Sequence, residues 1–236
     1  MNHVPAEKRE ATELWLIRHG ESTGNRDGIL QGQADLPLSP LGHTQVLALA
    51  ARLRGQHFGA LYASDLQRAQ DTAAAVAAAV KLSLRTDANL REIDTGAWSG
   101  LTTAQIRVRF PAEWLAWQQR DVVMKRGGGE SYVAAAERFR AACDRIAEAH
   151  PGERILVVAH GAVIRLYLTL AMGIDLDRTW HLMISNTSIT KVRPFAVAFD
   201  GDRPLAGRVV VVNDHAHFEL GGVRRNVDQE GANDPI

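Results

Sequence analysis

The feature that most constrains the fold of this chain is an apolar run that stops at a histidine and a glycine, and it occurs twice. Leu14–Ile17 is typical of a buried strand and is followed directly by "RHG", and the run in "RILVVAHG", residues 154–161, ends in the same way. Ligands of open α/β sheets bind beyond the carboxyl ends of the strands. His19 and His160 are therefore expected to share one site.

Segments typical of strands and helices alternate along the rest of the chain. Further strands are expected at 58–64 and 82–86, with closing strands at 187–199 and 208–214 that could form a hairpin with a long turn. Helices are expected at 40–56, 65–80, 130–150 and 162–173, and in 101–120 with a break at Pro111. This alternation predicts an α/β fold with a mostly parallel sheet and helices on both faces.

Length and composition favour one domain over residues 1–236, with a folded core at about 13–220 and a flexible tail at 221–236. The 27 basic and 27 acidic residues cancel, so neither nucleic acid nor a membrane is expected as a partner. The lone Cys143 is expected to be a packed helix residue. With no signal core and no apolar stretch of about eighteen residues, a cytoplasmic location is expected. Monomer and homodimer remain open.

Two more charged residues are placed at the same edge of the sheet. Arg68 falls in the first turn of a helix that follows a strand, where a cation opposes the helix dipole unless an anion lies between them. Glu92 precedes the glycine-containing turn of "LREIDTGAWSGLT". The alternatives are a solvated Arg68 and a Glu92 that pairs with Arg91.

Two arginines, two histidines and a carboxylate suit phosphoryl transfer. A phosphate monoester carries about two negative charges near neutral pH, and arginine forks match its oxygens. Imidazole, with a reference pKa of about 6.5, is partly unprotonated near pH 7 and can act as a nucleophile. A carboxyl group can protonate the leaving alkoxide and then deprotonate a water molecule. These residue types therefore indicate transfer through a phosphohistidine.

Four motifs, in order, resemble those of the histidine phosphatase superfamily, also called the phosphoglycerate mutase-like family: "RHGESTGN", "SDLQRAQDTA", "LREIDTGAWSGLT" and "VVAHGAVIR". The resemblance extends from about Leu14 to Leu220 and includes "GGGES" and "VVVVNDHAHFE". It implies a three-layer α/β/α sandwich and a reaction that needs no metal and no other cofactor.

The resemblance also implies a role for each site residue. His19 would be the phosphorylated nucleophile, and Glu92 the proton donor and acceptor. Residues 93–130 would form a variable lid. The pocket for the phosphoryl group would be formed by Arg18, Asn25, Gln31, Gly32, Arg68, His160 and Gly161.

The chain departs from the glycolytic mutases of this family at three places. Those enzymes carry a tyrosine, a lysine and an arginine pair where this chain has Thr95, Thr103 and Gln118-Gln119. We therefore expect a phosphomonoester hydrolase of the phosphatase branch, with a small phosphorylated substrate. The lid tryptophans suggest a pocket that tolerates an apolar or aromatic leaving group; they are Trp98, Trp114 and Trp117.

The sequence leaves other functions open. One is a cofactor-dependent phosphoglycerate mutase, and another is a non-catalytic phosphate-binding module, against which the presence of His19 and Glu92 counts. His215 and His217 have the i, i+2 spacing of a metal site on one strand face, although packing or hydrogen bonding is expected for them. A nicotinamide cofactor is not expected because no G-x-G-x-x-G follows the first strand.

Overall fold

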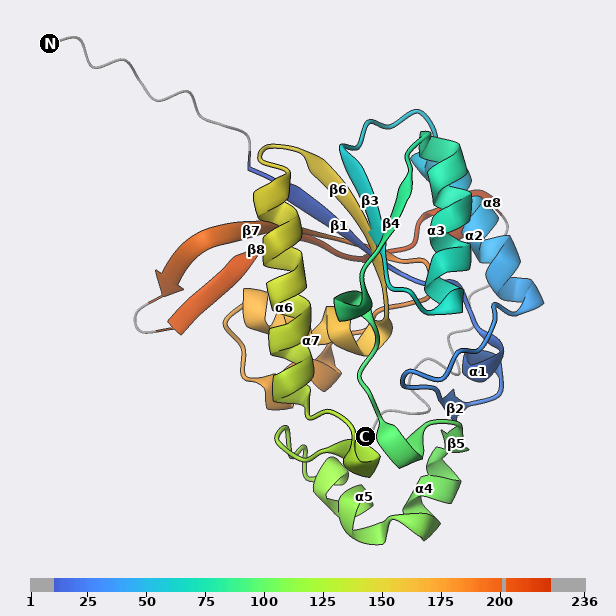
Figure 1. Ribbon diagram of the computed structural model, residues 1–236, viewed down its shortest axis with the longest axis vertical. Coiled ribbons are helices and arrows are strands. Elements are labelled where there is room, and N and C mark those ends of the chain that lie inside the picture. The colour runs from blue at the N-terminus through green and yellow to red at the C-terminus, as the bar shows by residue number, and fades with distance from the viewer. Residues whose placement is uncertain (1–10, 201–202, 222–236) are drawn as a thin grey trace, which may run out of the picture.

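The computed structural model describes residues 11–200 and 203–221 (Figure 1). Its centre is a six-stranded sheet in the order β4-β3-β6-β1-β7-β8. Neighbours among the first four strands are parallel, whereas β7 and β8 are antiparallel to their neighbours. This confirms the mostly parallel sheet. The strands are β1 (Glu13–Arg18), β3 (Ala60–Ala63), β4 (Leu84–Thr86), β6 (Arg154–Ala159), β7 (Ile189–Asp200) and β8 (Arg203–Asp214).

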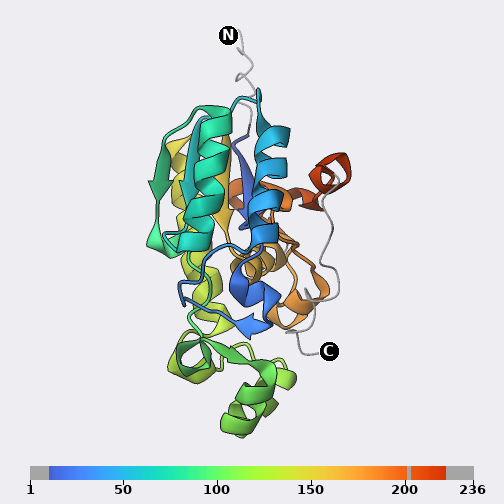
Figure 2. The ribbon, with the colours of Figure 1, turned by 90° about the vertical axis from the view of Figure 1, so that its right-hand side faces the viewer.

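Helices cover both faces of the sheet, as Figures 1 and 2 show. The alternation of β1 divides the core, because Leu14 and Leu16 pack with α6 (Tyr132–Ala149) and α7 (Gly161–Ala171). Trp15 and Ile17 alternate with these leucines along β1 and point to the other face of the sheet, where they pack with two other helices. Those helices are α2 (Pro40–Leu53) and α3 (Gln67–Val80). The three-layer α/β/α sandwich is confirmed.

Local sequence explains where the main helices begin. The Ser39 side chain accepts a hydrogen bond from Gly42 N, and Pro40 follows as the first residue of α2. The Ser131 side chain caps α6 by accepting from Ala134 N. Cys143 is buried in α6, and burial holds the pKa of its thiol well above the usual range, as expected for a packed residue.

The closing hairpin differs from the expectation in its turn. Pairing of β7 with β8 runs from Ile189↔Asp214 to Asp200↔Arg203, so only residues 201–202 separate the strands. Those two residues lie outside the described part of the chain, as does the expected tail from 222 onward. The expectation of a long turn was wrong because Gly201-Asp202, the two residues between the strands, was not recognised as a pair typical of two-residue hairpin loops.

Segment 93–130 projects from the carboxyl ends of the parallel strands in both views (Figures 1 and 2). We call it the lid. The break at Pro111 is confirmed, and a small core of Trp98, Ile106 and Trp117 holds the lid together. A two-stranded sheet of β2 and β5 joins it to the main domain and was not expected. The elements are β2 (Ile29–Leu30), η2 (Gly96–Trp98), β5 (Leu101–Thr102), α4 (Thr103–Arg109), α5 (Pro111–Gln118) and η3 (Arg126–Gly128).

The two ends of the lid meet backbone to backbone. A Cβ atom on Gly96 would lie 2.1 Å from Gly127 O, and one on Gly129 would lie 2.2 Å from Asp94 O. Gly96 and Gly127 both have positive φ, 47° and 53°, so glycine is required there on two grounds. Glu130 N donates to Asp94 O at 2.7 Å. The lid thus leaves and rejoins the domain at one point.

Four short helical segments complete the described chain: α1 (Thr23–Arg26), η1 (Ala88–Leu90), η4 (Leu176–His181) and α8 (His217–Gly221). Within residues 11–200 and 203–221, no helix has the length and apolar character needed to cross a membrane.

Candidate active site

A cavity of about 490 Å³ lies at the carboxyl ends of the parallel strands, beneath the lid. It has the size of a small-molecule site. Eight of the nine residues expected at the site line it: Arg18, His19, Asn25, Gln31, Gly32, Arg68, Glu92 and Gly161. The ninth, His160, is fully buried and lies beside His19, with the two ring centroids 5.0 Å apart. His160 was expected to line the pocket, and the structure places it next to the nucleophile candidate instead.

His19 follows β1 and is 3% exposed. Its Nδ1 lies 2.7 Å from Gly20 O. A carbonyl oxygen can only accept, so Nδ1 carries the proton and Nε2 keeps its lone pair. Burial lowers the pKa of His19 well below its usual range, and the charges of Arg68 and Arg18 lower it further. His19 is therefore neutral near pH 7, the form in which imidazole is a nucleophile.

His160 precedes the first residue of α7. Burial, followed by the charge of Arg68, also lowers its pKa well below the usual range. Both of its ring nitrogens are without a hydrogen-bond partner within the described residues. A neutral, buried imidazole with an unused N–H can donate to an anion that enters beside His19.

The two expected arginines are held in different ways. Arg68 lies in the first turn of α3 and is 1% exposed, so it is not a solvated surface residue. Its two terminal nitrogens donate to Ala34 O and Gly32 O at 2.8 and 2.9 Å. Burial lowers its pKa to about 10, so it remains charged at neutral pH. Arg18 donates to Ile184 O and packs against the start of α7, where a Cβ on Gly161 would lie 3.2 Å from its Nε.

Glu92 does not pair with Arg91, which forms an ion pair with Asp65 at 2.6 Å instead. The Glu92 carboxyl accepts from Ala162 N at 3.1 Å and Val163 N at 3.3 Å. These are amides of the first turn of α7, where the helix dipole favours negative charge. Glu92 thus lies in the cavity wall with its carboxyl directed by the helix that follows His160.

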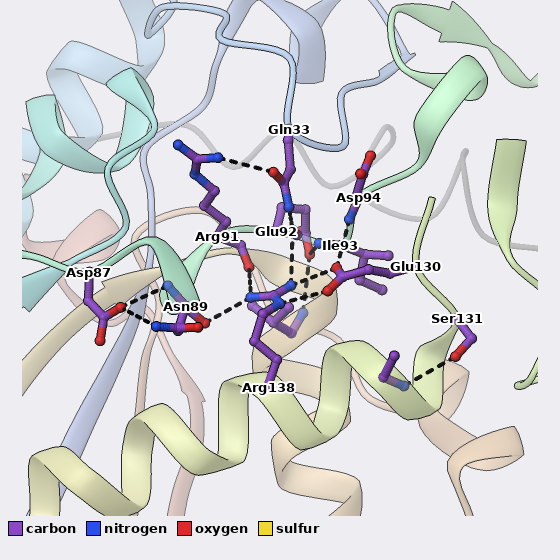
Figure 3. A network of polar contacts seen from close by, with 12 residues as sticks. Gln33, Asp87, Asn89, Arg91, Glu92, Ile93, Asp94, Glu130, Ser131 and Arg138 are labelled. Atoms are coloured by element: carbon purple, nitrogen blue, oxygen red, sulfur yellow. Dashed lines mark hydrogen bonds and ion pairs between the residues drawn. The ribbon is translucent and has the colours of Figure 1, made fainter. Parts of the chain in front are cut away.

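A network of polar contacts behind Glu92 holds its backbone (Figure 3). Arg138 of α6 donates to Glu92 O at 3.3 Å and forms an ion pair with Glu130 at 2.7 Å. Gln33 Nε2 also donates to Glu92 O, at 3.2 Å. The second Glu130 oxygen accepts from Asp94 N at 3.0 Å. The loop that carries the carboxyl is therefore fixed on both sides of residue 92.

Asn25 and Gln31 present amide groups to the cavity. Asn25 Oδ1 accepts from Ser22 N at 3.1 Å, which leaves its Nδ2 for a ligand. Gln31 Oε1 lies 2.8 Å from the Ser22 hydroxyl. Gly32 has φ of 51°, and a Cβ there would lie 2.1 Å from Thr95 Oγ1, so the chain needs glycine at this point.

Sequence reasoning missed the segment between η4 and β7. Ile184 and Asn186 line the cavity, and Asn186 donates to His19 O at 2.9 Å. Their irregular segment has no periodic pattern that could have revealed them. In the lid, Trp98 and Trp117 line the cavity, whereas Trp114 is not among its lining residues. Two lid arginines, Arg120 and Arg126, line it as well, so the lid side is less apolar than expected.

His215 and His217 form hydrogen bonds, as expected. His217 Nε2 lies 3.0 Å from Thr187 Oγ1, and His215 Nδ1 lies 2.7 Å from Asn213 O. In the part of the chain that the structure describes, no group of three or more His, Cys, Asp or Glu side chains could hold a metal ion.

Fold and site together define an α/β protein with an arginine-lined cavity at the carboxyl edge of its sheet, where ligands of such sheets bind. The chain belongs to the histidine phosphatase superfamily (branch 1), whose family model matches residues 14–203.

Relatives agree with this assignment. A metal-independent phosphoserine phosphatase of Arabidopsis thaliana is 38% identical over 169 residues, which are 70% of this chain and 71% of the relative. Phosphoglycerate mutase-like protein 4 of the same plant is 35% identical over 220 residues, 92% and 91% of the two chains. The solved structure of mycobacterial glucosyl-3-phosphoglycerate phosphatase with VO3 superposes with a TM-score of 0.73 at 32% identity. It covers 86% of this chain and 99% of that one.

Proposed function

We propose that this protein hydrolyses phosphomonoesters through a covalent phosphohistidine on His19. The observation that carries the proposal is the state of the His19 ring: Nδ1 is held by Gly20 O, the lowered pKa keeps the ring neutral, and Arg18 and Arg68 line the same cavity. The relatives named as phosphatases support the hydrolase activity.

In the first step, His19 Nε2 attacks phosphorus and the bond from phosphorus to the ester oxygen breaks. The departing alkoxide takes a proton from the Glu92 carboxyl, so the alcohol leaves neutral. In the second step Glu92 removes a proton from water as the water oxygen attacks phosphorus. The P–N bond then breaks, inorganic phosphate forms, and His19 returns to its neutral state.

The remaining residues stabilise the charge that develops on the phosphoryl oxygens. Arg18 and Arg68 supply fixed positive charge, and Arg68 is anchored by two carbonyl groups before substrate arrives. The Asn25 amide, the Gly161 N–H and the unpartnered ring of His160 supply further donors. Gln31 and Gly32 complete the pocket.

A rapid-quench experiment tests the nucleophile. Enzyme mixed with ³²P-labelled monoester should yield an acid-labile, base-stable adduct on His19, and His19→Ala should abolish both label and turnover. His43→Ala, which removes an exposed histidine of α2, is the matched control and should behave as wild type. Label on another residue, or full activity of His19→Ala, would overturn the proposal.

A second experiment tests the reaction class and the metal-free chemistry. Phosphate release from a panel of monoesters in EDTA is compared with phosphoglycerate mutase flux in the presence of a bisphosphoglycerate primer. We expect hydrolysis to persist in EDTA and to exceed mutase flux, because Thr95 faces the cavity where the mutases carry a tyrosine. Mutase turnover far above hydrolysis would favour the alternative function, and loss of activity in EDTA would exclude the metal-free mechanism.

A further inference from the structure

Arg126 is a buried cation that the phosphoryl-transfer mechanism does not use. It begins η3 of the lid, is 3% exposed and lines the cavity. Its Nε, Nη1 and Nη2 are all buried and have no hydrogen-bond partner within the described residues. Since removing a guanidinium from water is costly unless it is paired, an orphaned one that faces a cavity requires an explanation.

The nearby acidic groups are engaged elsewhere. Asp121 Oδ1 accepts from Val123 N at 2.9 Å and Met124 N at 3.1 Å, and Glu113 Oε2 accepts from Gly127 N at 2.8 Å. The guanidinium carbon of Arg126 lies 3.4 Å from the centre of the Tyr132 ring. A stacked ring offsets part of the lost hydration but does not use the five N–H donors of the guanidinium in its plane.

Two other arginines of the described chain, buried Arg68 and partly buried Arg138, show how carbonyl and carboxylate oxygens satisfy the terminal nitrogens of a guanidinium. Arg68 donates to two carbonyl groups, and Arg138 combines an ion pair with hydrogen bonds to carbonyls. Arg126 has neither kind of partner. Arg68 and Arg126 line one cavity, but only Arg68 has its terminal nitrogens hydrogen-bonded to the protein. This difference indicates that the Arg126 guanidinium is available to bind a ligand.

Arg126 is also distinct from the phosphoryl pocket. Burial lowers the pKa of Arg126, Tyr132 and Asp121 raise it in part, and the charge of Arg165 lowers it further. Burial also lowers the pKa of Arg68, and there the charge of Arg18 lowers it further. Among the cations that line the cavity, Arg18 and Arg68 lie at the carboxyl ends of the strands, whereas Arg126 lies in the lid and Arg165 in α7. Arg120, two residues beyond α5, is a further lid arginine that lines the cavity.

We propose that Arg126, assisted by Arg120, binds a second anionic group, a carboxylate or a phosphate, on the leaving-group part of the substrate. This inference rests on the proposed hydrolase function and assigns its substrate class: phosphomonoesters of small alcohols that carry their own anion. Tyr132, which stacks on Arg126, and Trp117 line the same cavity and would contact the carbon skeleton between the two anions. The expectation of a pocket that tolerates an apolar or aromatic leaving group is revised accordingly.

Equilibrium binding tests the subsite without requiring turnover. Calorimetry compares 3-phosphonopropanoate, which cannot be hydrolysed, with its carboxamide and with the bisphosphonate of the same length. A hydrogen bond to a charged group contributes roughly ten- to a hundredfold in affinity. Wild type should bind the carboxylate or the bisphosphonate at least tenfold more tightly than the amide, and whichever of the two is preferred identifies the anion.

Variants then assign the preference to the residue. Arg126→Met should lose the discrimination, Arg126→Lys should keep part of it, and Arg107→Met, at an exposed arginine of the lid, should keep all of it. Thermal unfolding separates binding from structure: removing an unpaired buried charge should leave the melting temperature of Arg126→Met equal to or above that of wild type. A large drop would assign Arg126 a structural role and overturn the proposal.

Turnover distinguishes failure of this inference from failure of the proposed function. The phosphate esters of 3-hydroxypropanoate and 3-hydroxypropanamide are compared by kcat/KM. Equal rates and equal affinities for the charged and neutral compounds would refute the subsite while leaving the hydrolase intact. A binding preference without any phosphate release would refute the hydrolase while leaving the subsite intact.

Discussion

Arg138 should control proton transfer at a distance by holding the loop of Glu92 in place. Its guanidinium donates to Asn89 O at 2.8 Å, Arg91 O at 3.0 Å and Glu92 O at 3.3 Å, and it forms the ion pair with Glu130. Burial alone would raise the pKa of Glu130, but hydrogen bonds from Arg138 and Asp94 N outweigh it and lower that pKa. Both partners are therefore charged at neutral pH.

The expected cost of Arg138→Met follows from these contacts. Breaking a buried ion pair typically costs about 3–5 kcal/mol. Since the two side chains are 19% and 23% exposed, we expect a loss of about 2–4 kcal/mol in the free energy of unfolding after allowance for solvent screening. Misplacing a catalytic group by about 1 Å can cost roughly a hundredfold in rate. We therefore expect a ten- to hundredfold fall in kcat for an alkyl phosphate.

The assay separates positioning from general damage. Single-turnover phosphorylation is measured with an alkyl phosphate, whose leaving group needs a proton, and with p-nitrophenyl phosphate, whose leaving group does not. Arg138→Met should slow the first far more than the second. Arg140→Met, which breaks an exposed pair with Asp144 on the same helix, should change neither. Equal losses on both substrates, or the same loss in the control, would refute the reasoning.

Three further predictions concern the groups in the cavity. Glu92→Gln should reduce phosphorylation by an alkyl phosphate roughly a hundred- to ten-thousandfold but spare p-nitrophenyl phosphate, as single-turnover rates will show; equal damage would mean that Glu92 transfers no proton. Arg68→Ala should lower kcat about a hundred- to thousandfold, and Arg68→Lys should recover only part of it, because lysine cannot reach Gly32 O and Ala34 O as a fork. A kcat/KM for Arg68→Ala within a few-fold of wild type would remove Arg68 from the pocket. Since the pKa of free His19 is lowered, its neutral form persists below pH 6.5, and the acid limb of kcat/KM should fall below that value. A limb at or above pH 6.5 would contradict the buried, cation-flanked state of the ring.

The sequence predicted the parts of this structure that depend on local signals. Strand ends marked by His-Gly placed His19 and His160 together, and Ser39-Pro40 marked the start of α2. It could not predict contacts made between distant segments. Glu92 bonds to the first turn of α7 because the fold brings residues 92 and 162 together, and nothing near Glu92 in sequence indicates that partner.

Short and irregular segments account for the remaining differences. β2 and β5 have two residues each, too few for any periodicity to be seen. Arg126 is buried because the lid folds over Tyr132, a contact between distant segments. The amino-acid composition of the lid, with its tryptophans, therefore suggested a more apolar pocket than the one observed. The length of the connection between β7 and β8 required recognition of the Gly201-Asp202 pair in the sequence.

The contact between Gly96 and Gly127 makes the lid a nearly closed ring whose two ends meet at one point, and the pairing of β5 with β2 is its second connection to the domain. For such a ring, the entropy of closure grows only with the logarithm of its length, about 0.6 kcal/mol for each doubling. Segments between residues 103 and 116, which neither pair with β2 nor line the cavity, can therefore be lengthened, shortened or exchanged at little cost to the sheet that carries His19. Such changes would alter the outer part of the lid and leave the residues at the carboxyl edge of the sheet in place.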